Sequence, residues 1–352
     1  MAIGFASELP RTGMAKSVDV LGKPVLVTRD DQGKFHVFAN ICRHRGHILV
    51  EGECTNKKLL TCPYHAWSYD LKGNFVVAPF WDGTENSSPT SEEKSSMGLI
   101  SIAFEIWYDI IFVNLSGKAE AFEKHIQELQ IRWHQHRPPS LLNCFSQQSY
   151  SLNGNWKLVA ENFLDNYHLP WIHPEIGDSI EASLGLEVEN QRLSKDIIGC
   201  VHPTAGEEKN KIEKPLPCWP DDTRRHPPLS LQQDLFFIFP NTCLVMEGNY
   251  LWSMILMPTA VDQTDEKIAL YVIGNQAMNH EYALSRSQLA DIIYRINDQD
   301  SQVIKQLQTG RKMHAASCGI FNSRHDQLGK WFHQRISEMM SGDIGPQHKQ
   351  SD

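Results

Sequence analysis

The sequences CRHRGH at residues 42–47 and CPYH at residues 62–65 set the expected fold of the first third of this chain. Each places one cysteine and one histidine in a short loop, Cys42 with His44 and Cys62 with His65. Histidine makes up 16 of the 352 residues, so finding it by chance at two prescribed positions has odds of about one in 500. We therefore predict that these four residues form a metal site.

Two metals suit this ligand set. Two thiolates and two imidazoles can hold a structural zinc ion as a tetrahedron, or one [2Fe–2S] cluster with both histidines on the same iron. Zinc fingers with two cysteines and two histidines usually pair Cys with Cys on a hairpin and His with His on a helix. Here each loop supplies one of each. His47 shares the first loop but lies outside the pattern.

The residues around these loops have the alternation of short strands. Val25–Thr28 and Phe35–Phe38 flank a polar turn and predict a hairpin, and Trp67–Tyr69 with Phe75–Val77 repeat the pattern. The polar stretch 82–96 is predicted to be a surface loop, and 119–134 an amphipathic helix. The proline pair after Arg137 is the predicted domain boundary, giving domains 1–137 and 138–352.

A second group of metal-binding residue types lies in the second domain. Residues 155–169 are predicted to form a helix that Pro170 ends. At about 100° per residue, Asp165 and His168 fall within about 60° of Leu158, on the apolar side of that helix. His173 follows closely enough to fold back toward His168. Two imidazoles and one carboxylate form the facial triad of non-haem Fe(II) sites. The alternative is that both histidines are hydrogen-bonded core residues.

The third ligand is sought on the helix predicted over 280–309. Its apolar residues lie within about 60° of one another at helical spacing, and Asp300 falls in the middle of their stripe, whereas Asp298 points to the polar side. A buried carboxylate without a partner is costly, so Asp300 is predicted to bind a metal or another cation. Alternatively, the helix bends or ends near Asn297 and leaves both aspartates exposed.

Together, the two sites resemble the large (α) subunit of Rieske non-haem iron oxygenases, the aromatic-ring-hydroxylating and quaternary-amine-oxidising family. The resemblance covers nearly the whole chain and includes NWK at 155–157, ENFLDNYH at 161–168, HP at 173–174 and QD at 299–300. It implies an α+β chain: an N-terminal all-β Rieske [2Fe–2S] domain, then a helix-grip (START-like) catalytic domain whose antiparallel sheet wraps a long helix. It also implies an N-terminal segment before Ile3, so Met1 is expected to be an internal methionine.

The resemblance assigns roles to the candidate residues. Cys42 and Cys62 would hold one iron of the cluster, and His44 and His65 the other. His168, His173 and Asp300 would bind the mononuclear Fe(II). Asp165 would link His168 to a Rieske histidine of the neighbouring subunit in a homotrimer, which is physically reasonable because a carboxylate accepting an imidazole N–H orients that ligand.

The implied activity is oxygenation of a small organic substrate, aromatic or a quaternary amine, by hydroxylation, dihydroxylation or demethylation. An NAD(P)H reductase, with or without a ferredoxin, would supply electrons, because the chain has no G-x-G-x-x-G fingerprint. The alternatives are a Rieske electron carrier with a non-catalytic small-molecule-binding lobe, and a zinc-stabilised structural protein. The pocket is expected to draw on residues 196–255, where an irregular flap is predicted over 196–230. Trp252, Phe236 and Phe237 would face the substrate or lie in the core.

Composition excludes several other classes. Charged residues make up 21% and hydrophobic residues 41%, with a net charge of −9, which offers no basic surface to nucleic acid. No apolar run approaches the ~20 residues that span a bilayer, and residues 1–8 lack the basic start and apolar core of a signal peptide. Eight cysteines in a large chain of this kind favour metal binding or burial over disulfides, so a cytoplasmic location is expected.

Overall fold

The computed structural model describes residues 1–85, 87–134, 139–173, 188–203, 214–217, 232–313 and 319–342. The chain divides into two compact units, Met1–Glu120 and Ala121–Asp352. This division precedes the predicted boundary at residue 137, because helix α2 (Phe122–His134) belongs to the second unit. Among the described residues, no helix combines the length and apolarity needed to cross a bilayer.

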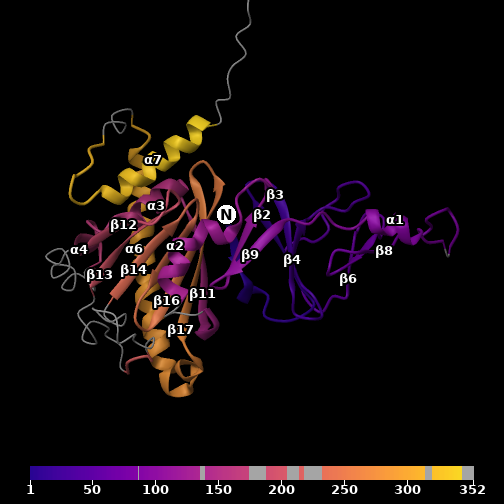
Figure 1. Ribbon diagram of the computed structural model, residues 1–352, viewed down its shortest axis with the longest axis horizontal. Coiled ribbons are helices and arrows are strands. Elements are labelled where there is room, and N and C mark those ends of the chain that lie inside the picture. Colours follow the sequence, from indigo (N-terminus) through magenta and orange to yellow (C-terminus); the bar gives the residue numbers. More distant parts are fainter. Residues whose placement is uncertain are drawn as a thin grey trace, which may run out of the picture. The chain divides into compact units, whose positions relative to one another are not determined.

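As predicted, the first unit consists mainly of short strands, and they form three antiparallel sheets (Figure 1). In sheet order the strands are β1 (Ala2–Phe5), β10 (Ile110–Asn114) and β9 (Ala103–Trp107); β4 (Phe35–Ala39), β3 (Lys23–Arg29), β2 (Met14–Val20) and β5 (Glu53–Cys54); and β6 (Leu59–Thr61), β7 (Ser68–Asp70) and β8 (Phe75–Val77). The two predicted hairpins are β3–β4 and β7–β8.

One short helix replaces part of the predicted loop over 82–96. Helix α1 (Ser91–Ser96) begins at a capping box, in which the Thr90 hydroxyl accepts from the Glu93 backbone N–H at 3.2 Å. The Glu93 carboxylate in turn accepts from the Thr90 N–H at 2.7 Å. Reciprocal caps of this kind satisfy two of the N–H groups that a helix start leaves free, and the T-x-x-E spacing was the signal for them.

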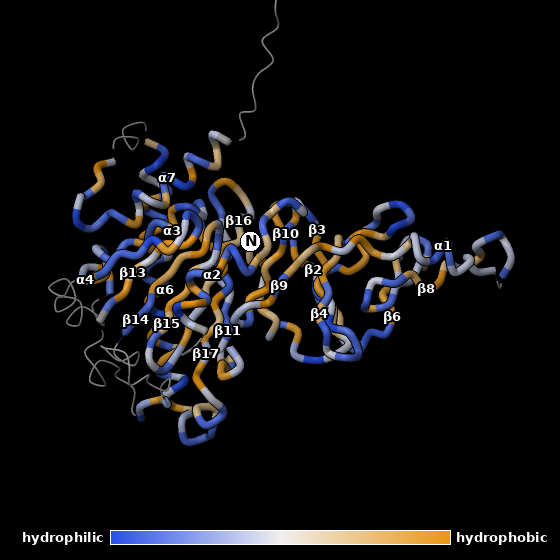
Figure 2. The backbone as a smooth tube through the Cα atoms, viewed as in Figure 1, coloured by the Kyte–Doolittle hydropathy of each residue, from blue (hydrophilic) through white to orange (hydrophobic). Residues whose placement is uncertain are grey.

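The second unit is a seven-stranded antiparallel sheet with helices on both faces (Figure 1). In sheet order its strands are β11 (Leu142–Leu152), β17 (Gln263–Ile273), β16 (Tyr250–Ala260), β15 (Thr242–Met246), β14 (Gln232–Ile238), β13 (Ile197–Pro203) and β12 (Glu189–Arg192). The principal helices after α2 are α3 (Trp156–Leu164), α4 (Leu169–Ile172), α6 (Ala283–Gly310) and α7 (Gln327–Gly342). Figure 2 shows apolar residues along the central strands of the sheet, whereas the edge strand β12 is hydrophilic.

Strand β14 shows which helix covers which face, because consecutive side chains point to opposite sides of a sheet. The ring of Phe236 lies 6.2 Å from Trp133 of α2, whereas the ring of Phe237 lies 5.6 Å from Phe332 of α7. Helices α3 and α6 share the core on the Phe237 side. On the α2 side, the buried Asp234 carboxylate accepts from the Trp133 indole N–H at 2.7 Å.

Two predictions for this unit need correction, and one falls partly outside the described residues. The helix predicted over 155–169 ends at Leu164, and Pro170 lies in the first turn of the short helix α4 instead of ending a longer one. Strand β15 has no counterpart in the prediction. Of the flap predicted over 196–230, residues 197–203 form β13, whereas 204–213 and 218–230 lie outside the described residues.

Candidate metal centres

The two cysteine–histidine loops of the first unit are built alike. In each, the cysteine N–H donates to the carbonyl five residues later at 2.8 Å, Cys42 to His47 and Cys62 to Trp67. In each, the residue four positions after the cysteine donates to the cysteine carbonyl and has a positive φ, 72° at Gly46 and 57° at Ala66. Glycine adopts a positive φ more readily than other residues, which explains why Gly46 occupies this position in the first loop.

The same loops separate sulfur from nitrogen. Cys42 and Cys62 are each 2% exposed, whereas His44 and His65 are exposed and bring their ring centroids to 4.6 Å of each other. Trp67 stacks on His44 at 4.7 Å. This arrangement suits a two-iron cluster whose irons have different ligands. The iron bound by the cysteines would lie inside the protein, and the iron bound by the histidines would lie at the surface.

Tyr69 is a residue of this site that the sequence reasoning missed. Its side chain is fully buried, and its hydroxyl lies 3.4 Å from the Cys42 sulfur while accepting from the Arg43 N–H at 2.9 Å. A cysteine thiolate can only accept, so with Cys42 bound to a metal the Tyr69 hydroxyl would be the donor to its sulfur. Hydrogen bonds to the sulfurs are one of the factors that set a cluster's reduction potential. The only sequence signal for Tyr69 was its place next to the polar Ser68 in strand β7.

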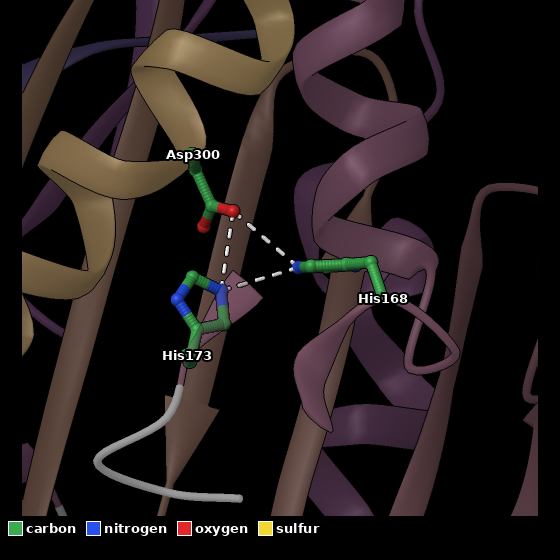
Figure 3. A group of neighbouring side chains, drawn as sticks. All are labelled: His168, His173 and Asp300. Carbon is green, nitrogen blue, oxygen red and sulfur yellow. Dashed lines mark hydrogen bonds and ion pairs between the residues drawn. The ribbon is translucent and has the colours of Figure 1, made fainter. Parts of the chain in front are cut away.

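In the second unit, three predicted residues meet at one point (Figure 3). The Nε2 atoms of His168 and His173 are 3.3 Å apart, and the Asp300 Oδ1 atom lies 3.4 Å from the first and 3.2 Å from the second. Ligands about 2.1 Å from one ion, at right angles, lie about 3.0 Å apart. Shifts of only a few tenths of an ångström, on the order of 0.2–0.4 Å, would therefore place all three on one octahedral face.

Neighbouring oxygens turn both imidazoles toward this point. The His173 Nδ1 atom lies 2.6 Å from the Gln299 side-chain carbonyl oxygen, which can only accept, so Nδ1 carries the proton and Nε2 presents its lone pair. The His168 Nδ1 atom faces the Asp165 carboxylate at 3.4 Å, an ion-pair distance. This Nδ1 has no hydrogen-bond partner among the described residues.

When both histidines are neutral, three acceptors converge here, an arrangement that calls for a cation. The nearest described N–H donor is the Asn162 amide, at 3.4 Å from Asp300 and 3.5 Å from His168. Burial lowers the pKa of His168, but Asp165 and Asp300 outweigh it and raise that pKa to about 9. Burial likewise opposes ionisation of Asp300, yet the two histidines hold its pKa below the ordinary value. A divalent cation fits this set of donors, and His173 is fully buried as a ligand should be.

The elements that carry these residues differ from the predicted ones. Asp165 follows the last residue of α3 in an extended conformation, and His168 is the N-cap of α4, so neither lies on the predicted helical stripe. Helix α6 runs unbroken through Asn297, which is buried, and it exposes Asp298 while directing Asp300 to the two histidines. Gln299 and Asn162 were quoted in the family motif without an assigned role.

A cavity of about 100 Å³ is lined by two of the three residues, His168 and Asp300. The sheet, α3 and α6 enclose it with mostly apolar side chains, including Trp252, whereas Phe236 and Phe237 are core residues. Glu266 also lines it and is 2% exposed. Burial raises the pKa of Glu266 to about 7 against the lowering effect of the Asn297 amide, and the charge of Asp300 adds to the rise.

Comparison with known sequences identifies the family. The sequence pattern of the ring-hydroxylating alpha subunit catalytic domain matches residues 140–342, and that of the Rieske [2Fe-2S] domain matches residues 1–87. Because the first match spans more than half of the chain, the chain belongs to the ring-hydroxylating alpha subunit family. Its two domains bring a [2Fe–2S] cluster and a mononuclear iron, and the predicted family and fold are confirmed.

Individual relatives agree with this assignment. The carnitine monooxygenase oxygenase subunit of Acinetobacter pittii (strain PHEA-2) is 28% identical over 186 residues, 52% of this chain and 48% of that protein. The chain therefore spans about half the length of the curated relatives it matches first.

Two solved structures share the fold. One is a quaternary ammonium Rieske monooxygenase, described with carnitine oxidation and inter-subunit electron transfer, with 20% identity and a TM-score of 0.74 over 96% of this chain and 88% of that one. The other is naphthalene 1,2-dioxygenase from Rhodococcus sp., with 18% identity and a TM-score of 0.76 over 98% of this chain and 90% of that one.

Proposed function

We propose that this chain is the oxygenase component of a multicomponent enzyme. It would use electrons delivered through its [2Fe–2S] cluster and O2 at its mononuclear Fe(II) to hydroxylate, dihydroxylate or demethylate a small organic substrate. The observation that carries the proposal is the convergence of His168, His173 and Asp300 beside an apolar cavity. A pure electron carrier would have no use for this group of two imidazoles and a carboxylate next to a small-molecule cavity.

The ligand assignments follow from donor type and burial. We assign His168, His173 and Asp300 to the mononuclear iron, leaving other coordination positions open. Cys42 with Cys62 and His44 with His65 are assigned to the two irons of the cluster. When bound, the cluster supplies electrons one at a time and the mononuclear iron activates O2. The chain's part is to hold the imidazoles in the right tautomer and to exclude water through the apolar cavity wall.

Asp165 is proposed to act at the route by which electrons arrive. Its side chain is 37% exposed and one of its oxygens lies 3.4 Å from His168 Nδ1. The other oxygen accepts from the Tyr167 N–H at 2.7 Å, which holds the carboxylate in place. An exposed carboxylate fixed in this way can orient His168 and also accept an N–H from a Rieske histidine of a neighbouring subunit.

The partners follow from this role. We propose a homotrimer, an NAD(P)H reductase as the source of electrons, directly or through a ferredoxin, and a cytoplasmic location. The acidic net charge of −9 favours no nucleic-acid or membrane partner.

Iron analysis tests the proposal. Anaerobically reconstituted wild-type protein should contain about three irons per chain, two in the cluster and one alone, and should couple NADH oxidation to O2 consumption with a reductase. Asp300→Ala should retain about two irons and the rhombic paramagnetic resonance of the cluster but lose turnover. Asp298→Ala, an exposed acid on the same helix, is the matched control and should resemble the wild type. Two irons in the wild-type protein would refute the mononuclear site.

A second variant separates electron delivery from metal binding. Asp165→Ala should keep both iron centres and lose turnover by about 100-fold, the upper end of the loss expected when a residue that orients a ligand is removed. Undiminished turnover would remove Asp165 from the electron route.

A further inference from the structure

Glu266 is a buried carboxylate that the iron-site assignments do not use. It lies on β17 with its side chain 2% exposed, and it lines the same cavity as His168 and Asp300. Its surroundings are mainly apolar, with Met254 and Ile293 also lining the cavity. Removing a carboxylate from water into such surroundings is costly unless it is paired.

The described residues supply only one partner for this carboxylate. The Asn297 side-chain amide donates to Oε2 at 2.8 Å, which fixes the orientation of the group. No described residue donates to Oε1, and no lysine or arginine is found among the described residues that line the cavity. The cavity wall therefore presents a fixed acceptor without a cation of its own.

We propose that Glu266 is a specificity-determining residue that binds the cationic amine group, quaternary or protonated, of the substrate. This inference rests on the proposed function, because it places the substrate in the cavity beside the mononuclear iron. A neutral aromatic hydrocarbon would leave the carboxylate unpaired, and an anionic substrate would be repelled by it. Phe163 and Trp252, whose rings meet edge to face at 5.7 Å, line the same cavity and offer aromatic surface to the alkyl groups of such a cation.

Probes of matched shape isolate the charge. Tetramethylammonium and tert-butylammonium are compact cations, quaternary and protonated respectively, and tert-butanol is a neutral molecule of nearly the same size. Binding of each is measured anaerobically from the broadening of its methyl proton signal on addition of the iron-loaded protein. No turnover is involved, so the result does not depend on whether the chain oxygenates anything.

The variants are chosen to isolate one carboxylate. Glu266→Gln keeps the shape and an acceptor oxygen but removes the charge. Asp265→Asn makes the equivalent change at the neighbouring position of β17, whose side chain points to the other face of the sheet. Iron content is measured in each protein, so that a change in the metal site is distinguished from a change in ligand binding.

The wild type and Asp265→Asn are expected to bind at least one of the two cations about tenfold or more tightly than tert-butanol. Glu266→Gln should lose that preference while keeping its iron. The cation that the wild type binds more tightly shows whether the site prefers a quaternary or a protonated amine.

Equal binding of tert-butanol by the wild type, or an unchanged cation preference in Glu266→Gln, would overturn the proposal. Loss of the mononuclear iron in Glu266→Gln would also overturn it, by showing that Glu266 supports the metal site. If that variant does not fold, equal binding of the cations and tert-butanol by the wild type would still overturn the proposal. Failure of turnover with intact cation binding would instead refute only the oxygenase function.

Discussion

Each histidine of the candidate iron site directs one ring nitrogen toward a neighbouring oxygen, by a hydrogen bond for His173 and at an ion-pair distance for His168, and turns the other nitrogen inward. For His173 that oxygen belongs to Gln299, which precedes Asp300 on the same helix. One turn of α6 therefore supplies both a candidate ligand, Asp300, and the group that fixes the tautomer of another, His173. Groups behind a ligand in this way usually matter almost as much as the ligand itself.

We expect Gln299→Leu to weaken iron binding at the mononuclear site by about 10–100-fold, because the His173 ring would lose the acceptor that holds its Nδ1 proton. A chelator competition followed by iron analysis measures this, and the cluster resonance should not change. Gln302→Leu, at an exposed position of the same helix, serves as the control. Equal iron affinity in both variants would show that packing alone orients His173.

Glu266 predicts a pH dependence of stability. Burial raises its pKa from the ordinary 4.5 to about 7. Between pH 4.5 and about 7, the folded chain therefore binds a proton at this carboxylate that the unfolded chain does not bind. Stability should therefore fall as pH rises from about 4.5 to about 7 and then level off, by on the order of 3 kcal/mol. In Glu266→Gln this contribution is absent. Thermal unfolding midpoints across that pH range test it, and parallel curves for wild type and variant would contradict the assignment to Glu266.

At the scale of helices and strands, the spacing of apolar residues predicted those features that depend on local sequence alone. The long helix was predictable because its apolar stripe repeats without interruption, and the same phase directed Asp300 inward and Asp298 outward, as the structure has them. The ends of α3 and α4 could not be predicted, because a proline is compatible both with the end of one helix and with the first turn of the next. His168 and Asp165 lie in that short connection.

The elements missed by prediction have a common cause. Strand β15 is buried at every position, so it lacks the alternation by which half-buried strands are recognised. Tyr69, Gln299 and Glu266 act through contacts with residues distant in sequence or hidden in the core, and only the folded chain brings those contacts together. The candidate ligands could be predicted from the sequence because metal chemistry restricts both residue type and spacing, and the structure brings His168, His173 and Asp300 together.

The turn before α3 fixes the distance between the two helices that carry the site. A Cβ atom built on Gly154 would lie 2.3 Å from the Ile304 Cγ2 atom of α6, so only glycine allows this approach. We expect Gly154→Ala to lower the free energy of unfolding by about 1–3 kcal/mol, a typical cost of overpacking. It should also reduce iron occupancy at the mononuclear site by displacing α6. Gly310→Ala, where a Cβ meets nothing within 4 Å, should do neither, and normal iron content in Gly154→Ala would show that the helices adjust without moving Asp300.

For the whole molecule, the proposed function divides between the two units. The first holds a buried cysteine pair with exposed histidines, and the second holds a triad of acceptors beside a cavity, with Asp165 half exposed. Exposed groups at both sites are what electron transfer between different subunits requires. In a ring of three identical chains, each cluster would then serve the iron of the next chain.

Mixed trimers give a quantitative test of that arrangement. Asp300→Ala should lack the mononuclear iron, and Cys42→Ser should lack the cluster, so each variant alone should be inactive. Co-expressed in equal amounts, they assemble at random, and a productive neighbour pair, with an intact cluster on one side and an intact iron site on the next, forms at about one interface in four. Specific activity should therefore recover to about a quarter of the wild-type value. The same variants mixed after separate purification should stay inactive if the trimers do not exchange subunits. No recovery on co-expression, in trimers shown by mass to contain both variants, would mean that each chain supplies its own iron with electrons.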